Sequence, residues 1–141
     1  MAKFTLEIEE DFDFQLIGIF SHAKDYRLCW ALNQEFGFDL TKEENFTVQL
    51  NSVVQEHSFF KYFEEENQLE YFLIGNRSDA GMLIPEEKCD YFFLIKGHYR
   101  DSERDSLKKK LNQLKPILAC SIIEVDELKS KQILIFQGED K

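Results

Sequence analysis

The sequence predicts a single α+β domain with a mostly antiparallel sheet and two helices. Short apolar runs with the periodicity of strands outnumber the two segments with helical periodicity, and the order is two strands, a helix, four strands, a helix and two strands. No stretch rich in proline, glycine or serine interrupts this order. We therefore assign residues 1–141 to one domain, with a frayed tail over residues 136–141.

The first part of the chain is predicted to form two strands and a helix. Residues 3–9 alternate apolar and polar side chains, which is typical of a half-exposed strand. Residues 12–20 are more continuously apolar and indicate a buried strand. Ser21 or Asp25 is expected to cap the helix that follows, and Gly37 supplies its left-handed stop.

The middle of the chain is predicted to be all β. Residues 46–50 alternate again, and we expect this strand to continue through residues 53–54. Residues 57–64 and 68–74 are aromatic-rich runs on either side of a polar turn, so they form the clearest hairpin. A polar loop over residues 75–81 follows.

The last part is predicted to contain a strand, a helix and two further strands. Residues 89–96 form a strongly apolar strand, Ser102 caps the helix and Pro116 marks its end. Strands over residues 117–125 and 133–136 follow. The helix has apolar side chains at i, i+4 and i+7, which are Leu107, Leu111 and Leu114.

Two segments share one order of elements. Residues 12–36 and 89–116 each contain a buried strand, a polar turn and a helix, and another strand follows each of them. A ferredoxin-like sheet of split βαβ units requires two such segments. The second unit, residues 89–125, is also similar in pattern to regulatory amino-acid-binding modules of the ACT type.

The charge balance argues against nucleic acid and membranes as partners. Seventeen Lys and Arg residues face 27 Asp and Glu residues, which gives a net charge of −10, whereas phosphate backbones are bound chiefly by cations. The same charge disfavours an anionic membrane surface, and no signal pattern opens the chain, so we expect a cytoplasmic protein. Carboxylates interrupt the densest basic segment, which we interpret as a solvated helix face: Arg100, Arg104, Lys108, Lys109, Lys110 and Lys115.

The cysteines are predicted to be buried and unreactive. Cys29, Cys89 and Cys120 are widely spaced, odd in number and placed inside apolar runs. A free cysteine in such a run usually behaves as a small apolar core residue. We therefore expect neither a disulfide nor a metal site.

Residues 84–91, with the sequence IPEEKCDY, resemble the signature of the bacterial IPExxVDY family. Cys89 stands in place of the valine and keeps this position small and apolar. Family members have this length, and residues 11–36 and 128–136 are similar as well, so the resemblance covers most of the chain. It implies no catalytic residues that can be carried over.

The motif also has a physical interpretation. Pro85 fixes its own φ and favours an extended conformation at Ile84, which suits the entrance to a strand. Glu86, Asp90 and Tyr91 are then expected to tie the loop to the sheet through hydrogen bonds. The alternative is that the same side chains form a site for a ligand or a partner.

No local catalytic signature occurs, so we assign no catalytic, cofactor-binding or metal-binding residues and do not expect an enzyme. His22 and His98 each lie between a buried strand and a helix, where ligand sites are common, although histidines in polar turns are more often merely solvated. We therefore name a candidate pocket near the 84–91 loop: His22, Pro85, Glu86, Asp90 and His98.

The aromatic residues indicate a contact surface. Tyr26 and Trp30 lie one helical turn apart and away from the apolar stripe of their helix, where either a loop or the first strand covers them or a partner does. The strands over residues 68–74 and 89–96 are apolar on both faces, although helices on one side of a sheet cover only one face. The candidate interface is Tyr26, Trp30, Tyr71 and Phe72.

These patterns favour a non-enzymatic interaction or regulatory protein that forms a homodimer, since a twofold contact would cover the second face of the sheet. Cover by the first strand or by residues 75–85 is the alternative, but that loop is polar. A small-ligand sensor or small enzyme with a pocket near His22, His98 and the 84–91 loop is the second hypothesis. The sequence identifies no ligand, substrate or protein partner.

Overall fold

The structure, a computed structural model, describes residues 14–50 and 52–124, and it confirms the predicted α+β class. The strands predicted over residues 3–9 and 133–136 and the tail over 136–141 lie outside the described residues. The elements of the described part are β1 (Phe14–Phe20), α2 (Asp25–Phe36), β2 (Thr41–Lys42), β3 (Phe46–Leu50), β4 (Val53–His57), β5 (Phe59–Glu64), β6 (Leu69–Gly75), β7 (Arg77–Ser78), β8 (Gly81–Met82), β9 (Tyr91–Lys96), α3 (Asp101–Leu111) and β10 (Ala119–Ile123).

The main sheet has six strands in the order β10-β1-β9-β6-β5-β2, and all its neighbours are antiparallel. Because β9 and β10 both run antiparallel to β1 between them, they are parallel to each other, and α3 connects them as in a split βαβ unit. In the same way β1 and β6 are parallel and flank β9. The four strands β10-β1-β9-β6 and the two helices therefore have the ferredoxin-like arrangement that the sequence predicted.

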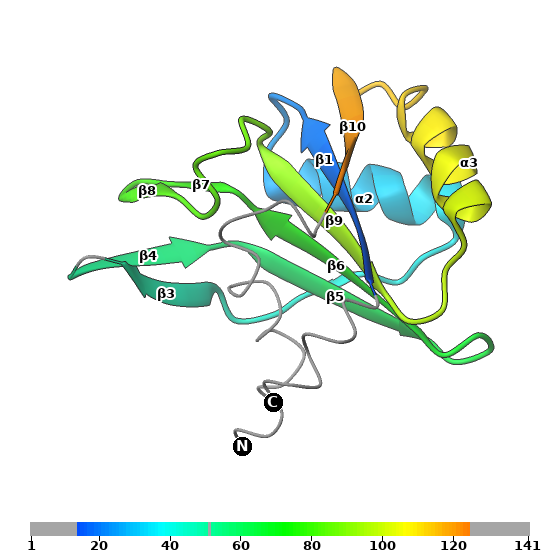
Figure 1. Cartoon of the computed structure of the whole chain (residues 1–141), viewed down its shortest axis with the longest axis horizontal. Coiled ribbons are helices and arrows are strands. Elements are labelled where there is room, and N and C mark those ends of the chain that lie inside the picture. The colour runs from blue at the N-terminus through cyan, green and yellow to red at the C-terminus, as the bar shows by residue number, and fades with distance from the viewer. Residues whose placement is uncertain (1–13, 51, 125–141) are drawn as a thin grey trace.

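The first βαβ unit is closed by a different strand from the one expected. The chain does not pass from α2 directly to a neighbour of β9, because β2, β3, β4 and β5 come first. β2 lies at the edge of the main sheet, next to β5. β3 and β4 form a separate two-stranded ribbon that extends beyond the main sheet (Figure 1). β6 is the strand that completes the unit.

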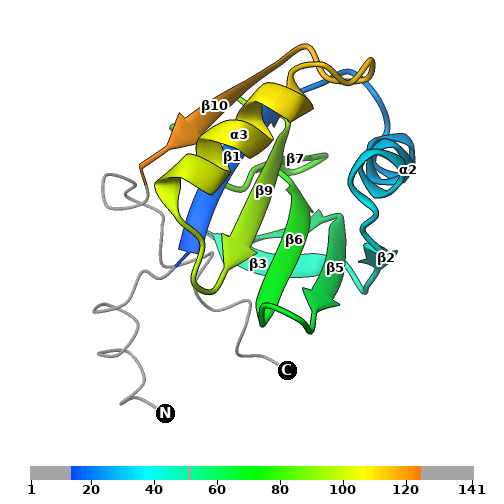
Figure 2. The same ribbon diagram turned by 90° about the vertical axis from the view of Figure 1, so that its right-hand side faces the viewer.

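Both helices pack on one face of the main sheet (Figures 1 and 2). Leu28 and Leu32 of α2 and Leu107 and Leu111 of α3 are buried against this face, as their spacing predicted, and Leu114 is partly buried. The sheet contributes apolar side chains from its four ferredoxin-like strands: Ile17, Ile19, Tyr71, Leu73, Phe93, Ile95 and Cys120.

The second face of the sheet is also buried, and the chain itself covers it. Leu83 and Ile84, in the segment between β8 and β9, are both 0% exposed and belong to the same core cluster as Phe72 of β6. The β3–β4 ribbon adds Phe46 and Val48. The expectation that residues 75–85 are too polar to cover this face was therefore wrong, because the apolar end of that segment makes the contact.

Tyr71 and Phe72 are core residues, which corrects their assignment to the candidate interface. Tyr71 faces the helices and Phe72 faces the second core cluster, and they are 6% and 1% exposed. Consecutive residues of a strand point to opposite faces. Because both faces are covered within the chain, neither side chain forms part of a protein-binding surface.

The turns differ from the sequence prediction in three places. Val53 and Val54 do not prolong β3 but begin the returning strand β4, and Ser52 in the turn has a φ of 70°. His57 ends β4, so the β5–β6 hairpin begins at Phe59. The polar loop over residues 75–81 contains the short β7–β8 ribbon.

Neither helix begins with the predicted cap, and the N-cap residue of α2, Lys24, makes no capping hydrogen bond with its side chain. Ser21 does not cap α2, because its hydroxyl donates to the carbonyl of Pro116 (2.5 Å) and accepts from the N–H of Ala23. The Glu103 side chain, rather than Ser102, satisfies the start of α3 by accepting from the N–H of Arg100 (2.9 Å). The predicted stop of α2 is confirmed, since Gly37 has a φ of 69°.

All three cysteines are free and buried. Burial raises the pKa of the Cys89 thiol to about 12 and that of Cys120 to about 11, and it also raises the pKa of Cys29. Because the thiolate is the reactive form, we expect all three to react slowly with an aromatic disulfide reagent in the native protein and rapidly in urea. Fast stoichiometric labelling of any one thiol under native conditions would contradict this assignment.

His57 is a fully buried histidine. Its Nδ1 lies 2.8 Å from the carbonyl oxygen of Gly75 and its Nε2 lies 2.9 Å from Oε1 of Gln55. Burial lowers the pKa of His57, and the hydrogen bond to the Gly75 carbonyl opposes this only in part.

The lowered pKa of His57 predicts a loss of stability in mild acid. The unfolded chain takes up a proton at this residue near pH 6.5, whereas the folded chain resists it until a lower pH. The contribution of neutral His57 is therefore complete above about pH 6.5 and is lost as the pH falls through the folded pKa. Urea unfolding from pH 7.5 to 5.0 should show a smaller decline for His57→Gln than for the wild type. The exposed-site control His98→Gln is expected to follow the wild type, and identical declines in all three proteins would refute the prediction.

Candidate functional site

The structure separates the two histidines of the predicted pocket. β1 and β9 are antiparallel, with Ile19 opposite Tyr91 at one end and Phe14 opposite Lys96 at the other. His22 follows β1 and His98 follows β9, so they lie at opposite ends of the sheet. The prediction that they share one pocket was wrong, because the carboxyl ends of neighbouring strands meet only in parallel sheets.

His22 lines an open cleft of about 700 Å³ at its end of the sheet. Residues 21–25, at the start of α2, form one side, and Arg77, Asp79 and Asp90 approach from the segment that connects β6 to β9. Of the predicted pocket residues, His22 and Asp90 meet here. Pro85, Glu86 and His98 are not among the lining residues.

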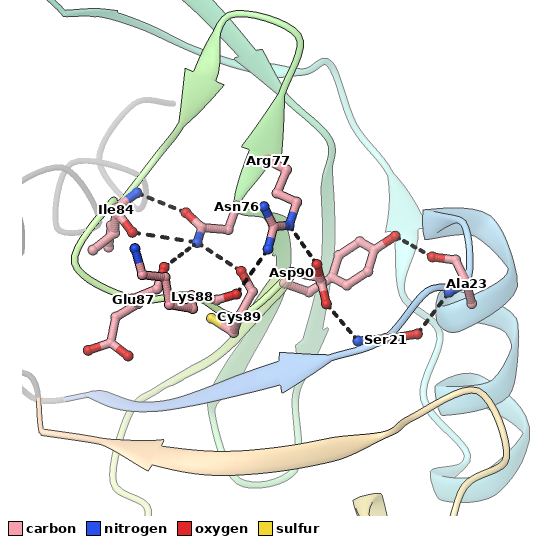
Figure 3. A network of polar contacts seen from close by, with 10 residues as sticks. Ser21, Ala23, Asn76, Arg77, Ile84, Glu87, Lys88, Cys89 and Asp90 are labelled. Atoms are coloured by element: carbon pink, nitrogen blue, oxygen red, sulfur yellow. Dashed lines mark hydrogen bonds and ion pairs between the residues drawn. The ribbon is translucent and has the colours of Figure 1, made fainter.

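Asp90 joins three segments of the chain at this cleft. One carboxylate oxygen lies 2.6 Å from Nε of Arg77, and the other accepts from the N–H of Ser21 at 2.9 Å (Figure 3). The next residue, Tyr91, donates its hydroxyl to the carbonyl oxygen of Ala23 at 2.7 Å. These contacts fix the start of β9 against the end of β1 and the beginning of α2.

Asn76 holds the segment between β6 and β9 together from inside. Its side chain is fully buried. The amide oxygen accepts from the N–H of Ile84 at 2.8 Å. The amide nitrogen donates toward the carbonyls of Cys89 (2.9 Å), Glu87 (3.1 Å) and Ile84 (3.5 Å), as Figure 3 shows. Sequence reasoning missed Asn76, because an asparagine after a strand usually signals only a turn.

The residues of the IPEEKCDY segment thus act mainly on the fold. Asp90 and Tyr91 make the ties to the sheet that the clamp interpretation predicted. Cys89 lies over Gly18 of β1, where an added Cβ would come within 3.0 Å of its sulfur, so the loop packs directly on the strand backbone. Asp90 and Tyr91 meet their hydrogen-bonding needs within the chain, which favours a clamp over a ligand site.

The outward face of α2 is the second candidate. Tyr26 and Trp30 are 67% and 64% exposed, so no loop or strand of the described residues covers them. At 100° per residue they share an arc of about 100° with Arg27 and Gln34, which are also exposed. We call these four residues the α2 outer strip. The strip contains no carboxylate.

Arg104, in the first half of α3, is paired with carboxylates of the same helix. The guanidinium of Arg104 lies 3.7 Å from Asp101 and 3.4 Å from Asp105. Arg104 also donates to Oε1 of Gln15 in β1 at 3.2 Å. The arginines at the start of the segment thus fit the interpretation as a helix face in which carboxylates balance the cations.

Within residues 14–50 and 52–124, no three His, Cys, Asp or Glu side chains are grouped so that they could hold a metal ion. Neither described helix is long and apolar enough to cross a membrane. No family model matches the chain and no curated protein matches it. The likeness to the IPExxVDY family therefore stays a prediction.

Proposed function

We propose that the chain is a non-enzymatic interaction module and that the α2 outer strip is its contact surface. The observation that carries this proposal is the exposure of Tyr26 and Trp30 on adjacent turns of one helix. Tryptophan, tyrosine and arginine are the residues that most often dominate binding energy at protein interfaces, and Arg27 lies beside this pair. The three free, buried thiols suit the reducing cytoplasm in which we place the module.

The first partner that we propose for the strip is a second copy of the chain. The covered sheet no longer supplies a reason for a dimer, but the strip is suited to a twofold contact. Suppose that two α2 helices cross antiparallel at Trp30. Arg27 lies three residues before the crossing and Gln34 lies four residues after it, so Arg27 of one copy faces Gln34 of the other. In such a contact, no charged side chain of the strip lies opposite a side chain of the same charge.

The contact is expected to be weak. One helix face provides much less than the roughly 800 Å² per partner that a standard stable interface buries. Each copy also carries a net charge of −10, and the mutual repulsion is screened over about 8 Å at physiological ionic strength. We therefore expect a dissociation constant in the micromolar range or above, and tighter association as salt is raised.

Substitution of Trp30 is expected to abolish this association. In sedimentation equilibrium, the wild type should rise from the monomer mass of 16.8 kDa toward twice that value with concentration, while Trp30→Ala should stay monomeric with unchanged thermal stability. Phe63→Ala is the matched control, because Phe63 is an exposed aromatic residue outside the strip. Equal association of Trp30→Ala and the wild type would place the contact elsewhere.

A ligand-binding role for the cleft at His22 is the alternative proposal. His22 and Arg77 are exposed there and open to a solute. However, Asp90 and Tyr91 are already bonded to the protein, and the predicted partners His98, Pro85 and Glu86 do not line the cleft. The geometry therefore favours the interaction module.

A further inference from the structure

A second cleft, of about 360 Å³, lies on the helix side of the sheet between the end of α2 and α3. Both helices stand over the strands of the sheet there (Figure 2). Tyr71 of β6 contributes to the cleft, together with the rings of Phe36, Phe38 and Tyr99. The Phe38 ring lies 4.5 Å from the Tyr71 ring and 5.2 Å from the Phe36 ring between centroids. Four of the nine lining residues are thus aromatic.

The Tyr71 hydroxyl is the polar group that this cleft leaves without a partner. Tyr71 is only 6% exposed, and its side chain makes no hydrogen bond within the described part of the chain. No described side-chain nitrogen or oxygen that is sealed from solvent lacks a partner. The hydroxyl of Tyr71 must therefore reach solvent, and Tyr71 lines this cleft.

The hydroxyls of the cleft are donors at neutral pH. Burial raises the pKa of Tyr71 well above its usual range and raises that of Tyr99 to about 12, with Glu103 adding to both effects. Both phenols therefore stay protonated. Ser102 and Ser106, one turn apart on α3, add two more hydroxyl groups to the lining. An aromatic cleft of a few hundred Å³ with a few convergent polar groups is typical of a small-molecule site.

The charges at the cleft favour an uncharged ligand. Glu103 and Lys110 both line it and have opposite signs. Oε1 of Glu103 already accepts from the N–H of Arg100 and lies 3.6 Å from Nε of the Arg100 guanidinium, so part of its charge is balanced within the chain. The negative charge of Glu103 acts on the Tyr71 hydroxyl and would repel a ligand anion bound close to it.

We propose that this cleft binds a small, uncharged, planar aromatic molecule whose carbonyl oxygen or ring nitrogen accepts a hydrogen bond from the Tyr71 hydroxyl. The aromatic rings of the cleft supply the surface against which a flat ring packs. This site goes beyond the proposed interaction module. It shares no residue with the α2 outer strip, so either proposal can fail without the other.

Ligand-detected NMR titration of the full chain with 4-quinolone, a flat ring with a carbonyl group, tests the site. Indole, a flat ring without such an acceptor, is the matched probe. We expect 4-quinolone to bind with a submillimolar dissociation constant and to bind about 3- to 10-fold more weakly to Tyr71→Phe, which loses one hydrogen bond. Indole binding should be the same in both proteins.

Two further variants make the outcome unambiguous. Tyr62→Phe is the matched control, because Tyr62 stacks on Tyr71 at 5.7 Å between centroids but does not line the cleft; its affinity for 4-quinolone should equal that of the wild type. Ser106→Phe places a ring in the cleft from an exposed helix position and should abolish binding of both probes. Absence of binding at millimolar 4-quinolone, or equal affinity in the wild type, Tyr71→Phe and Ser106→Phe, would overturn the proposal.

Discussion

Replacement of Asn76 by alanine is expected to lower the free energy of unfolding by about 3–5 kcal/mol, because several buried backbone groups lose their partner at once. The Asn76 amide satisfies the N–H of Ile84 and contacts three carbonyl oxygens of the segment that leads into β9. That segment also covers the second face of the sheet through Leu83 and Ile84. Loss of the amide therefore weakens both the loop and the core beneath it.

Urea denaturation at pH 7 measures this effect, with Asn45→Ala as the control. Asn45 is exposed and bonds only to exposed side chains, so its replacement should change stability by no more than about 0.5 kcal/mol. Asn76→Asp keeps the acceptor but places a carboxylate against carbonyl oxygens. The folded state should then favour the protonated acid, so relative to the wild type this variant should be less stable at pH 7 than at pH 4. A loss at Asn76 no greater than that at Asn45 would contradict the assigned role.

Phe72→Ala is expected to destabilise the fold by about 3–5 kcal/mol through lost burial and the cavity that remains. Phe72 stacks on Phe59 at 5.7 Å between ring centroids and belongs to the cluster that includes Leu83 and Ile84. If Phe72 instead lay on a surface that a second copy covers, its loss would change association far more than the stability of the monomer.

Trp30→Ala serves as the comparison for Phe72→Ala. Trp30 is a large aromatic residue that is mostly exposed, so its loss should alter monomer stability by no more than about 0.5 kcal/mol. Both variants can be measured by thermal and urea unfolding at low protein concentration. Similar stability for Phe72→Ala and the wild type would show that the second face of the sheet is not a packed core.

The fold was predictable because its local signals agree with one another. The spacing of Leu28, Leu32, Leu107 and Leu111 placed both helices, and Gly37 ended the first of them at the right residue. Two strand–helix–strand segments led to the ferredoxin-like arrangement. The β3–β4 ribbon was missed, because the sequence VQLNSVV has the same apolar alternation in one long strand as in two paired strands, and only the turn at Ser52 distinguishes them.

The candidate site was less predictable because it depends on which ends of the strands lie side by side in the sheet. His22 and His98 occupy equivalent positions in the sequence pattern, yet antiparallel pairing puts them at opposite ends of the sheet. Asn76 acts through backbone atoms of residues 8 to 13 positions away, and no periodicity encodes such contacts. The cleft beside Tyr71 likewise arises from the distance between two helices, which residue spacing does not specify.

The strands that are apolar on both faces were identified correctly, but the prediction of what covers their second face was wrong. Both faces of β6 and β9 are apolar, and the sequence rightly required something to cover the second one. The chain does so with Leu83, Ile84 and the β3–β4 ribbon, because a segment that is polar at its start can still end in two apolar residues. Among the described residues, the α2 outer strip carries the two most exposed aromatic side chains, Tyr26 and Trp30.

Trp30 is the single tryptophan of the chain, so acrylamide quenching of its fluorescence across protein concentration tests the proposed contact most directly. At low concentration the exposed indole should be quenched efficiently and emit at long wavelength. As the concentration rises through the dissociation constant, the account predicts weaker quenching and a shift of the emission to shorter wavelength, because a second copy covers the α2 outer strip. Quenching and emission that stay constant up to millimolar protein would contradict the account.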